Sequence, residues 1–257
     1  MSLKHALYSA VSRAGRALAP GAPRPGLRVL VYHSVGGTLA SDPYGTAIDP
    51  ARFRSHLDAL EALRGAWVPA AFAPPTGARH EFALTFDDGY RDTLSRAAPL
   101  LAARGWPFTV FVTPDLIDGG ELYLSKRELR ELAAHPGAQI GAHGNRHVPL
   151  TRLDDAALAS ELAASRARLE DWLGSPVTLM SYPHGAVDRR VRRAAQAAGF
   201  TLAGCSRYGL NEPGRDPLLL CRTEIVAWDD EEDLRLKTAG HWDWFRWRRP
   251  DPAAKIS

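Results

Sequence analysis

The feature that most constrains the fold of this chain is an alternation of short apolar runs with longer amphipathic patterns. Residues 108–112 (FTVFV) are an almost purely β-forming run, typical of a strand that is buried on both faces. Residues 154–173 form the longest helical pattern, and Gly174 follows it as a stop signal. Because strand and helix patterns alternate, the sequence predicts an α/β fold with a parallel sheet covered by helices.

Periodicity and the turn residues between the runs give bounds for each predicted element. The predicted strands are 27–32, 82–86, 108–112, 138–142, 177–182, 200–203, 218–221 and 224–228. The predicted helices are 2–19, 50–63, 92–104, 124–134, 154–173 and 188–198. No internal repeat competes with this series, so we expect one barrel domain over residues 27–240. It would be preceded by a basic amphipathic segment and linker (1–26) and followed by an aromatic and basic tail (241–257).

Composition excludes several classes of protein. The chain has 257 residues, of which 45% are hydrophobic, enough to fill the core of one large domain. Its formal charge is only +3 and no reading motif appears, so we expect no nucleic-acid partner. Cys205 and Cys221 are the only cysteines and are interpreted as two buried thiols. There is neither an apolar run of ~18 residues nor a good signal peptide, so the expected compartment is the cytoplasm.

Polar clusters directly follow four of the predicted strands. They are Tyr32-His33, Asp87-Asp88, His143 and Tyr182-Pro183-His184. In barrels of parallel strands the active site lies at the carboxyl ends of the strands. We therefore expect these clusters to converge on one rim of the barrel.

One carboxylate and two imidazoles in these clusters suit a divalent metal ion. A hydrolytic metal site needs three protein ligands and an open position for water, and Asp88, His143 and His147 offer such a set. His143 and His147 are four residues apart, so one helical turn would place both rings on the same side. Zinc is the first choice of metal, with cobalt, nickel or iron as alternatives. The competing interpretation is that Asp87 and Asp88 cap the next helix and the histidines are surface residues.

The remaining polar groups suggest a base, an acid and an oxyanion site. Adjacent residues that leave a strand point in opposite directions, so Asp87 can face bound water while Asp88 binds the metal. His33 is the best-placed proton donor by position, although a core or surface histidine is an equal alternative. The turn at 182–185 (YPHG) can direct backbone N–H groups at a developing oxyanion, or it can be an ordinary strand-to-helix turn.

Three motifs together resemble a known family. TFDDG at 85–89, H-x3-H at 143–147 and YPHG at 182–185 are similar to the motifs of polysaccharide deacetylases of the NodB-homology type, carbohydrate esterase family 4. The resemblance runs from Arg28 to Trp228 and implies an irregular (β/α) barrel with metal-dependent deacetylation of sugars. It implies Asp87 as general base, and Asp88, His143 and His147 as metal ligands. It also implies that Tyr182, Pro183, His184 and Gly185 form the substrate and oxyanion turn, with the backbone N–H near His184 completing the oxyanion hole.

The segment Val31–Val35 resembles the branch that deacetylates poly-N-acetylglucosamine. In that branch the acid histidine comes from this early strand, which implies His33 as the general acid. The sequence also departs from the family, because Leu179, Met180 and Ser181 stand where an arginine is usual. Arg222 is the candidate to orient Asp87 instead, with a structural salt bridge as the alternative.

Both termini carry features that suit a membrane surface. Residues 2–19 place Leu3, Leu7, Val11, Ala14 and Leu18 on one helical face and basic residues on the other. Trp242, Trp244 and Trp247 lie among arginines near the other end, as interfacial aromatics do. Each segment could instead pack on the barrel. If the termini bind lipid, we expect peripheral attachment at the inner face of the membrane and a lipid-linked sugar as substrate.

The leading hypothesis is therefore a metal-dependent hydrolase that removes an acetyl group from an N-acetylated polysaccharide or glycolipid. The alternative from another class is a carbohydrate-binding protein with a vestigial metal site, which would not need a free base beside the ligands. An iron oxygenase also uses two histidines and a carboxylate, but its carboxylate normally lies close to the first histidine in sequence.

Overall fold

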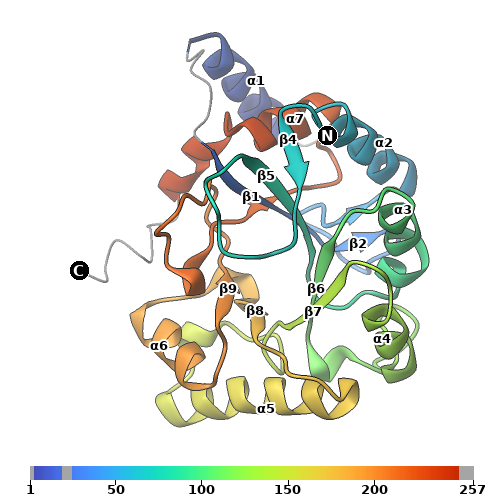
Figure 1. Ribbon diagram of the computed structural model, residues 1–257, viewed down its shortest axis with the longest axis vertical. Coiled ribbons are helices and arrows are strands. Elements are labelled where there is room, and N and C mark those ends of the chain that lie inside the picture. The colour runs from blue at the N-terminus through green and yellow to red at the C-terminus, as the bar shows by residue number, and fades with distance from the viewer. Residues whose placement is uncertain (1–2, 19–24, 249–257) are drawn as a thin grey trace.

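The computed structural model describes residues 3–18 and 25–248, and within them an eight-stranded parallel sheet curls into an open barrel with helices outside it (Figure 1). The strand order is β10-β1-β5-β6-β7-β8-β9, and β4 pairs with the first half of β5. The strands are β1 (Gly26–Tyr32), β4 (Trp67–Pro69), β5 (His80–Phe86), β6 (Phe108–Val112), β7 (Ala138–Ala142), β8 (Leu179–Ser181), β9 (Leu202–Gly204) and β10 (Thr223–Glu224). A parallel bridge between Gly204 and Leu220 nearly closes the barrel beside β10. The predicted α/β barrel is confirmed.

The helices surround this sheet in chain order. They are α1 (Leu3–Leu18), α2 (Pro50–Glu61), α3 (Ala98–Ala102), α4 (Lys126–Ala133), α5 (Asp155–Leu173), α6 (Arg189–Ala197) and α7 (Glu231–Ala239). A short pair of strands, β2 (Ser34–Val35) and β3 (Ala47–Ile48), lies beside the barrel. The longest helix, α5, begins where the Asp154 side chain accepts a hydrogen bond from the Ala157 N–H. It ends at Gly174, whose φ of 67° is a conformation that glycine adopts readily.

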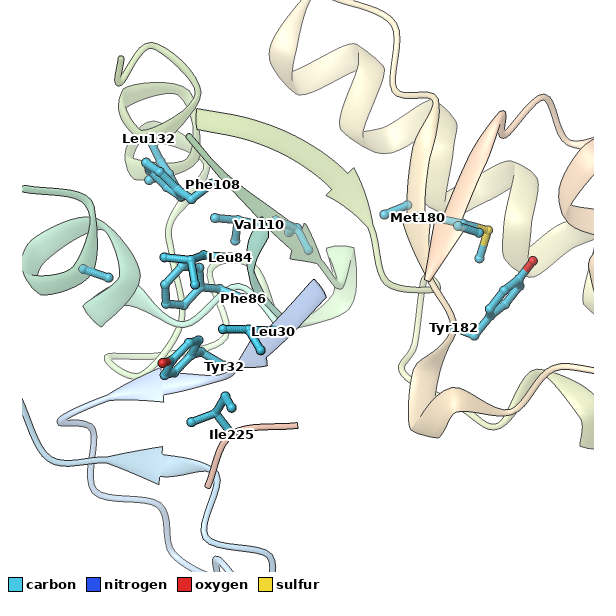
Figure 2. Packing of buried hydrophobic residues seen from close by; sticks show 14 of the residues in the cluster. Leu30, Tyr32, Leu84, Phe86, Phe108, Val110, Leu132, Met180, Tyr182 and Ile225 are labelled. Carbon is cyan, nitrogen blue, oxygen red and sulfur yellow. The ribbon is translucent and has the colours of Figure 1, made fainter. Parts of the chain in front are cut away.

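Alternation along the strands separates two apolar layers. Leu30, Leu84 and Val110 face the helices and belong to the main core (Figure 2). Val29, Ala83 and Phe111 point the other way and fill the barrel interior. Residues of the inner face that lie further along the same strands reach the carboxyl rim, and there they become polar.

Most predicted elements are present, but three predictions are wrong. Residues 218–221 are not a strand, because Pro217–Leu219 form a short 3-10 helix (η5) that begins at an Asp216 side-chain cap. The predicted helix 92–104 is divided into a π-helical turn (η1, Thr93–Ala97) and the short α3. The predicted strand 224–228 is reduced to Thr223–Glu224.

Several elements have no predicted counterpart, among them the two-residue strands β2 and β3. The strand β4 is only three residues long. Helix α7 buries Asp233 and Lys237, so its inward face lacks the apolar period that predicts a helix. Cys205 and Cys221 are free and buried, as expected. The division at residues 26 and 240 stays a prediction; α1 packs on α7, and part of the predicted tail lies outside the described residues.

Candidate active site

Two consecutive aspartates leave β5 in different directions at the carboxyl rim. Asp87 continues the inward-facing series of Ala83 and Thr85 and is buried in the barrel mouth. Asp88 has a φ of 75°, in the left-handed region that aspartate adopts more readily than most residues, and Gly89 follows with a φ of 84°. The turn presents both carboxylates to one pocket, each from a different side.

The predicted metal ligands come together. Oδ1 of Asp88 lies 3.2 Å from Nε2 of His147 and 3.5 Å from Nε2 of His143. Neighbouring ligand atoms of a tetrahedral zinc site with bonds of ~2.0–2.1 Å are about 3.3 Å apart. This Asp88 oxygen is buried and has no hydrogen-bond partner among the described residues. The donor set and its spacing therefore fit a divalent ion.

Hydrogen bonding fixes which nitrogen His143 can offer. Its Nδ1 lies 2.9 Å from the carbonyl oxygen of Ser181, and because a carbonyl only accepts, Nδ1 carries the proton. Nε2 is then a lone-pair donor directed at Asp88. Burial lowers the pKa of His143 to about 4, even though Asp87 and Asp88 act in the opposite direction. At neutral pH this imidazole is uncharged, as a metal ligand must be.

The other two candidate ligands, Asp88 and His147, shift each other's pKa through their close contact. Burial would raise the pKa of Asp88, but the close contact with the His147 ring and the charges of His33 and His143 outweigh burial and lower it to about 2. Burial would lower the pKa of His147, and its interaction with the Asp88 carboxylate raises it instead. Asp88 is thus ionised at any physiological pH.

The two histidines share one side of the pocket, but not because of a helix. Residues 143–149 are a loop, so the predicted helical turn is wrong. Gly144 (φ 67°) and His147 (φ 57°) bend this loop until the two ring centroids are 5.0 Å apart. Glu161 of α5 is buried and accepts hydrogen bonds from the N–H groups of Asn145 and Arg146, at 2.9 and 2.7 Å. A buried carboxylate therefore holds the loop in the bent form.

Asp87 is paired with Arg222 at the bottom of the pocket. The guanidinium donates to both carboxylate oxygens at 2.8 Å, and both residues are almost completely buried. Ser181 adds a third hydrogen bond, from its Oγ to Oδ2 of Asp87 at 3.2 Å. Burial alone would raise the pKa of Asp87, but Arg222, with help from His143, holds it well below its usual range. Asp87 is therefore an ionised carboxylate beside the candidate metal-ligand cluster.

His33 lies in the same pocket. It follows β1 on the face of Val31, and its Nδ1 is buried without a hydrogen-bond partner among the described residues. The pocket has a volume of about 400 Å³, within the range of small-ligand sites. Its lining includes Asp87, Asp88, His143, His147 and His33, together with the aromatic side chains of Tyr44, Tyr208 and Phe245.

The turn at 182–185 borders the pocket, but two of its backbone N–H groups are engaged. The N–H of Tyr182 donates to the Gly204 carbonyl at 3.1 Å, and that of Gly185 donates to the Tyr182 carbonyl at 2.8 Å. Pro183 has no N–H, and its side chain is not in the lining. Tyr182, His184 and Gly185 line the pocket, and the role of this turn in binding substrate or an oxyanion stays a prediction. The expected oxyanion donor is the backbone near His184, whose φ is 57°.

Several residues that line or support the pocket escaped the sequence analysis. Ser181 bonds to Asp87, Arg222 and His143, yet a serine at a strand end carries no distinctive signal. Glu161 lies in a helix where an acidic residue usually faces solvent. Tyr208 and Phe245 come from segments after the last motif, and Phe245 belonged to the tail that we interpreted as lipid-binding or packing.

Comparison with known proteins agrees with the fold and the motifs. Residues 74–203, just over half of the chain, match the model of the family described as polysaccharide deacetylase. The chain belongs to this family.

Curated relatives are similar over part of their length. The protein YxkH of Bacillus subtilis (strain 168), which carries a polysaccharide deacetylase name, is 31% identical over 126 residues, 49% of this chain and 44% of that protein. A chitin deacetylase of Pestalotiopsis sp is 33% identical over 103 residues, 40% of this chain and 34% of that enzyme. The matched region thus spans less than half of each relative.

Solved structures share the fold over a larger share of the chain. The Streptococcus pyogenes deacetylase PplD, in complex with acetate, gives a TM-score of 0.70 at 19% identity and covers 84% of this chain and 99% of PplD. IcaB from Ammonifex degensii gives a TM-score of 0.70 at 24% identity, covering 85% of this chain and 97% of IcaB.

Proposed function

We propose that this protein is a metal-dependent hydrolase that removes an acetyl group from an N-acetylated sugar of a polysaccharide or glycolipid. The observation that carries the proposal is the cluster of Asp88, His143 and His147 beside the ionised Asp87–Arg222 pair, in a pocket wide enough for a small ligand. Membership of the polysaccharide deacetylase family supports the same reaction class.

Asp88, His143 and His147 would hold the ion, with zinc as the first choice and cobalt, nickel or iron as alternatives. When bound, such an ion polarises the acetyl carbonyl and makes a water molecule easier to deprotonate. His143 offers Nε2 because Ser181 fixes its tautomer, and Glu161 holds the loop that carries His147 near Asp88.

Asp87 is proposed as the general base. Arg222 keeps it ionised, so it can take a proton from the attacking water at neutral pH. Each carboxylate oxygen has two lone pairs, so the bonds from Arg222 and Ser181 leave acceptor capacity for that proton. The carbon–nitrogen bond then breaks, and His33 donates a proton to the departing nitrogen, which yields acetate and a free amine. The backbone near His184 is proposed to stabilise the oxyanion.

Acetate release from N-acetylglucosamine oligomers tests this assignment. Asp87→Asn and His33→Ala should each lower turnover by ~10²–10⁴-fold. Asp155→Asn, an exposed aspartate of α5, and His80→Ala, at the opposite end of β5, are the matched controls and should retain activity. Wild-type acetate release from Asp87→Asn would refute its role as base. Oligomer binding without acetate release from the unmodified protein would favour a carbohydrate-binding protein with a vestigial metal site.

We also propose a cytoplasmic location with peripheral attachment at the inner face of the membrane. The motivating observations are the excess of basic residues before Asp42, which is the first acidic residue, and the aromatic and basic residues after 241. Fractionation of cells that express the full chain, with and without a high-salt wash, tests this location. Recovery outside the inner membrane and the cytoplasm would contradict it.

A further inference from the structure

Helix α1 docks on the barrel by its polar face and turns its apolar face outward. His5, Ser9 and Ser12 are buried, and they recur at the spacing of one helix face. Leu7, Ala10, Val11 and Ala14 are exposed and form the opposite face, which we call the outward stripe. Leu7 is 62% exposed and Val11 46%. A helix that only completed a core would show the reverse arrangement.

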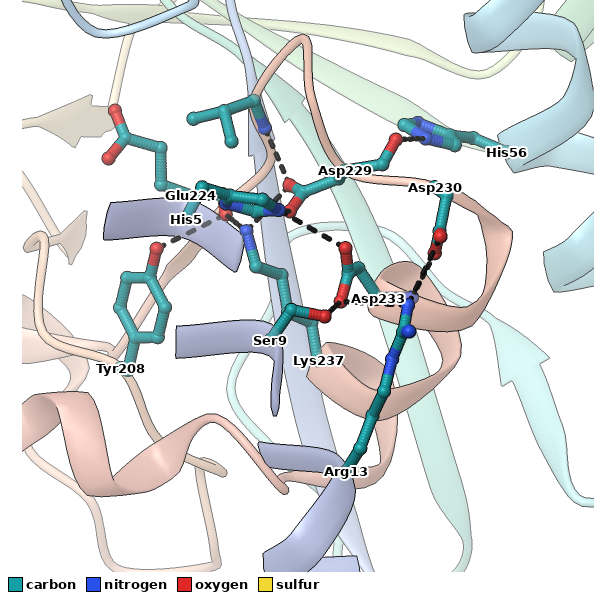
Figure 3. Close-up of polar contacts among 11 residues, drawn as sticks. His5, Ser9, Arg13, His56, Tyr208, Glu224, Asp229, Asp230, Asp233 and Lys237 are labelled. Atoms are coloured by element: carbon teal, nitrogen blue, oxygen red, sulfur yellow. Dashed lines mark hydrogen bonds and ion pairs between the residues drawn. The ribbon is translucent and has the colours of Figure 1, made fainter. Parts of the chain in front are cut away.

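The docked face is held by a buried polar network (Figure 3). Nε2 of His5 lies 3.1 Å from Oδ2 of Asp233, and the Ser9 hydroxyl donates to Oδ1 of the same carboxylate. The Trp244 indole N–H donates to Ser12 Oγ at 3.0 Å. Arg13 adds an ion pair to Asp230 at the margin, at 3.2 Å. Each buried polar residue of this face therefore has a specific partner, which fixes the orientation of the helix.

The network is a docking device and not a second metal site. His5, Asp229 and Asp233 have the donor types and proximity of a metal cluster. However, the Lys237 ammonium lies 2.6 Å from Oδ2 of Asp229 and already supplies the positive charge that the carboxylates need. The ring of His5 also stacks on Trp242. Oδ1 of Asp229, which has no hydrogen bond among the described residues, faces Nε2 of His5 at 3.6 Å.

Docking places helix α1 beside a residue that lines the active-site pocket. The ring of Tyr8 on α1 contacts Phe245, with centroids 5.6 Å apart, and Phe245 lines the pocket. Phe245 in turn packs on Tyr208, another lining residue, at 5.0 Å. Trp247, on the same short helix η6 (Asp243–Arg248) as Phe245, is 80% exposed. One helix and one turn thus link an exposed apolar surface to the pocket.

Charge indicates which partner would cover this surface. Residues 1–24 contain four basic residues and no acidic one, and three arginines lie at 246, 248 and 249. Among the described residues, no helix is both long and apolar enough to cross a bilayer. Exposed apolar side chains, an exposed tryptophan and neighbouring segments whose sequence is rich in basic residues suit the headgroup layer of an anionic membrane.

We propose that the outward stripe of α1, together with Trp247, docks on an anionic phospholipid bilayer and holds the pocket mouth beside it, so that the enzyme acts on N-acetylated sugars carried by lipid. The second half of this inference rests on the proposed deacetylase function. The first half, membrane docking, concerns binding alone and is tested without any measurement of enzyme activity.

Vesicle co-sedimentation of the full chain tests the binding half. The protein should sediment with vesicles of phosphatidylglycerol and phosphatidylcholine and far less with phosphatidylcholine alone. Leu7→Glu/Val11→Glu should lower the partition coefficient by about 100-fold, because two apolar side chains no longer enter the interface. Ala156→Glu/Ala159→Glu adds the same charge to the exposed face of α5 and should leave binding unchanged. Wild-type binding by the α1 variant, or no binding by the unmodified protein, would overturn the inference. The inference would also be overturned if sedimentation velocity showed a dimer that forms through the outward stripe and this dimer did not bind vesicles.

Acetate release in two formats tests the substrate half. The unmodified protein should act faster on an N-acetylglucosaminyl lipid in anionic vesicles than on a soluble oligomer. Leu7→Glu/Val11→Glu should lose that advantage and keep its rate on the oligomer. If the α1 variant kept the same rate advantage on the vesicle substrate as the unmodified protein, the proposal of a lipid-carried substrate would be wrong. Absence of acetate release in every format, with vesicle binding intact, would refute the deacetylase function and leave membrane docking in place.

Discussion

Removal of the Arg222 guanidinium should destabilise the protein strongly, because it leaves Asp87 as an unpaired charge in the barrel. Both side chains are almost fully buried, and two hydrogen bonds of 2.8 Å join them. Two unit charges about 4 Å apart interact by about 4 kcal/mol at an effective dielectric constant of 20. This agrees with the ~3–5 kcal/mol found when one partner of a buried pair is removed. For Arg222→Met we therefore expect the free energy of unfolding to fall by about 4 kcal/mol.

Urea unfolding of the metal-free protein measures this change. With a slope of about 3 kcal/mol/M, the midpoint of Arg222→Met should move down by roughly 1–2 M. Asp87→Asn/Arg222→Met removes both charges and should recover most of that loss, which gives a double-mutant coupling energy of about 2 kcal/mol or more. A single variant that unfolds within 0.5 kcal/mol (about one RT) of the unmodified protein, or a coupling energy near zero, would refute the argument that the pair is electrostatically interdependent.

Three further outcomes follow from the same geometry. Chelation should abolish acetate release, and added zinc should restore it. If activity persisted after exhaustive chelation, the proposed metal dependence would be wrong. Glu161→Gln should weaken zinc binding by about 10–100-fold in a direct titration, because the loop that carries His147 loses a charged acceptor, whereas Glu170→Gln on the same helix should not. Since the pKa of His143 is lowered to about 4, its neutral form contributes stability above the unfolded pKa of ~6.5, and that contribution should disappear as pH falls from about 6.5 to 4. The urea midpoint of the metal-free protein should show this slope, and His143→Gln should show a smaller one, because His56 and His184 also have lowered pKa values; equal slopes would contradict the assignment.

The sequence predicts the parts of the site that depend on strand ends. Asp87 and Asp88 follow an apolar run, and a parallel sheet brings such residues to one rim whatever the details of packing. The sequence also connects His143 and His147 with these aspartates, because two histidines and one carboxylate form a suitable ligand set for a single divalent ion. Their local backbone could not be predicted, because a bend at Gly144 and His147 depends on Glu161, a residue of a distant helix turn.

Side chains that support the site could not be predicted for a similar reason. Ser181 and Glu161 act through tertiary contacts, and nothing in their neighbouring residues distinguishes them from ordinary strand and helix positions. Helix α7 illustrates the same limit in the fold. Its buried face carries Asp233 and Lys237, so a rule based on apolar periodicity cannot detect it, although the network with α1 makes burial of these charges tolerable.

The arginine that the family usually has near residues 179–181 is absent here, and Arg222 reaches Asp87 from another part of the barrel. Ser181 stands near the position where the family usually has an arginine, and its small side chain leaves room beside Asp87. Arg222, which precedes β10, crosses that space and donates to Asp87 and to Ser181 Oγ. Its path runs past Gly204 of β9, where a Cβ atom would overlap the arginine side chain. The glycine, the serine and the arginine are therefore one mutually dependent solution for keeping Asp87 ionised. Arg222→Met and Gly204→Ala should therefore both lower acetate release, whereas Gly65→Ala, where a Cβ atom meets nothing, should have no effect. If Gly204→Ala retained full activity, the arginine could reach Asp87 by another path, and the three residues would have to be regarded as independent.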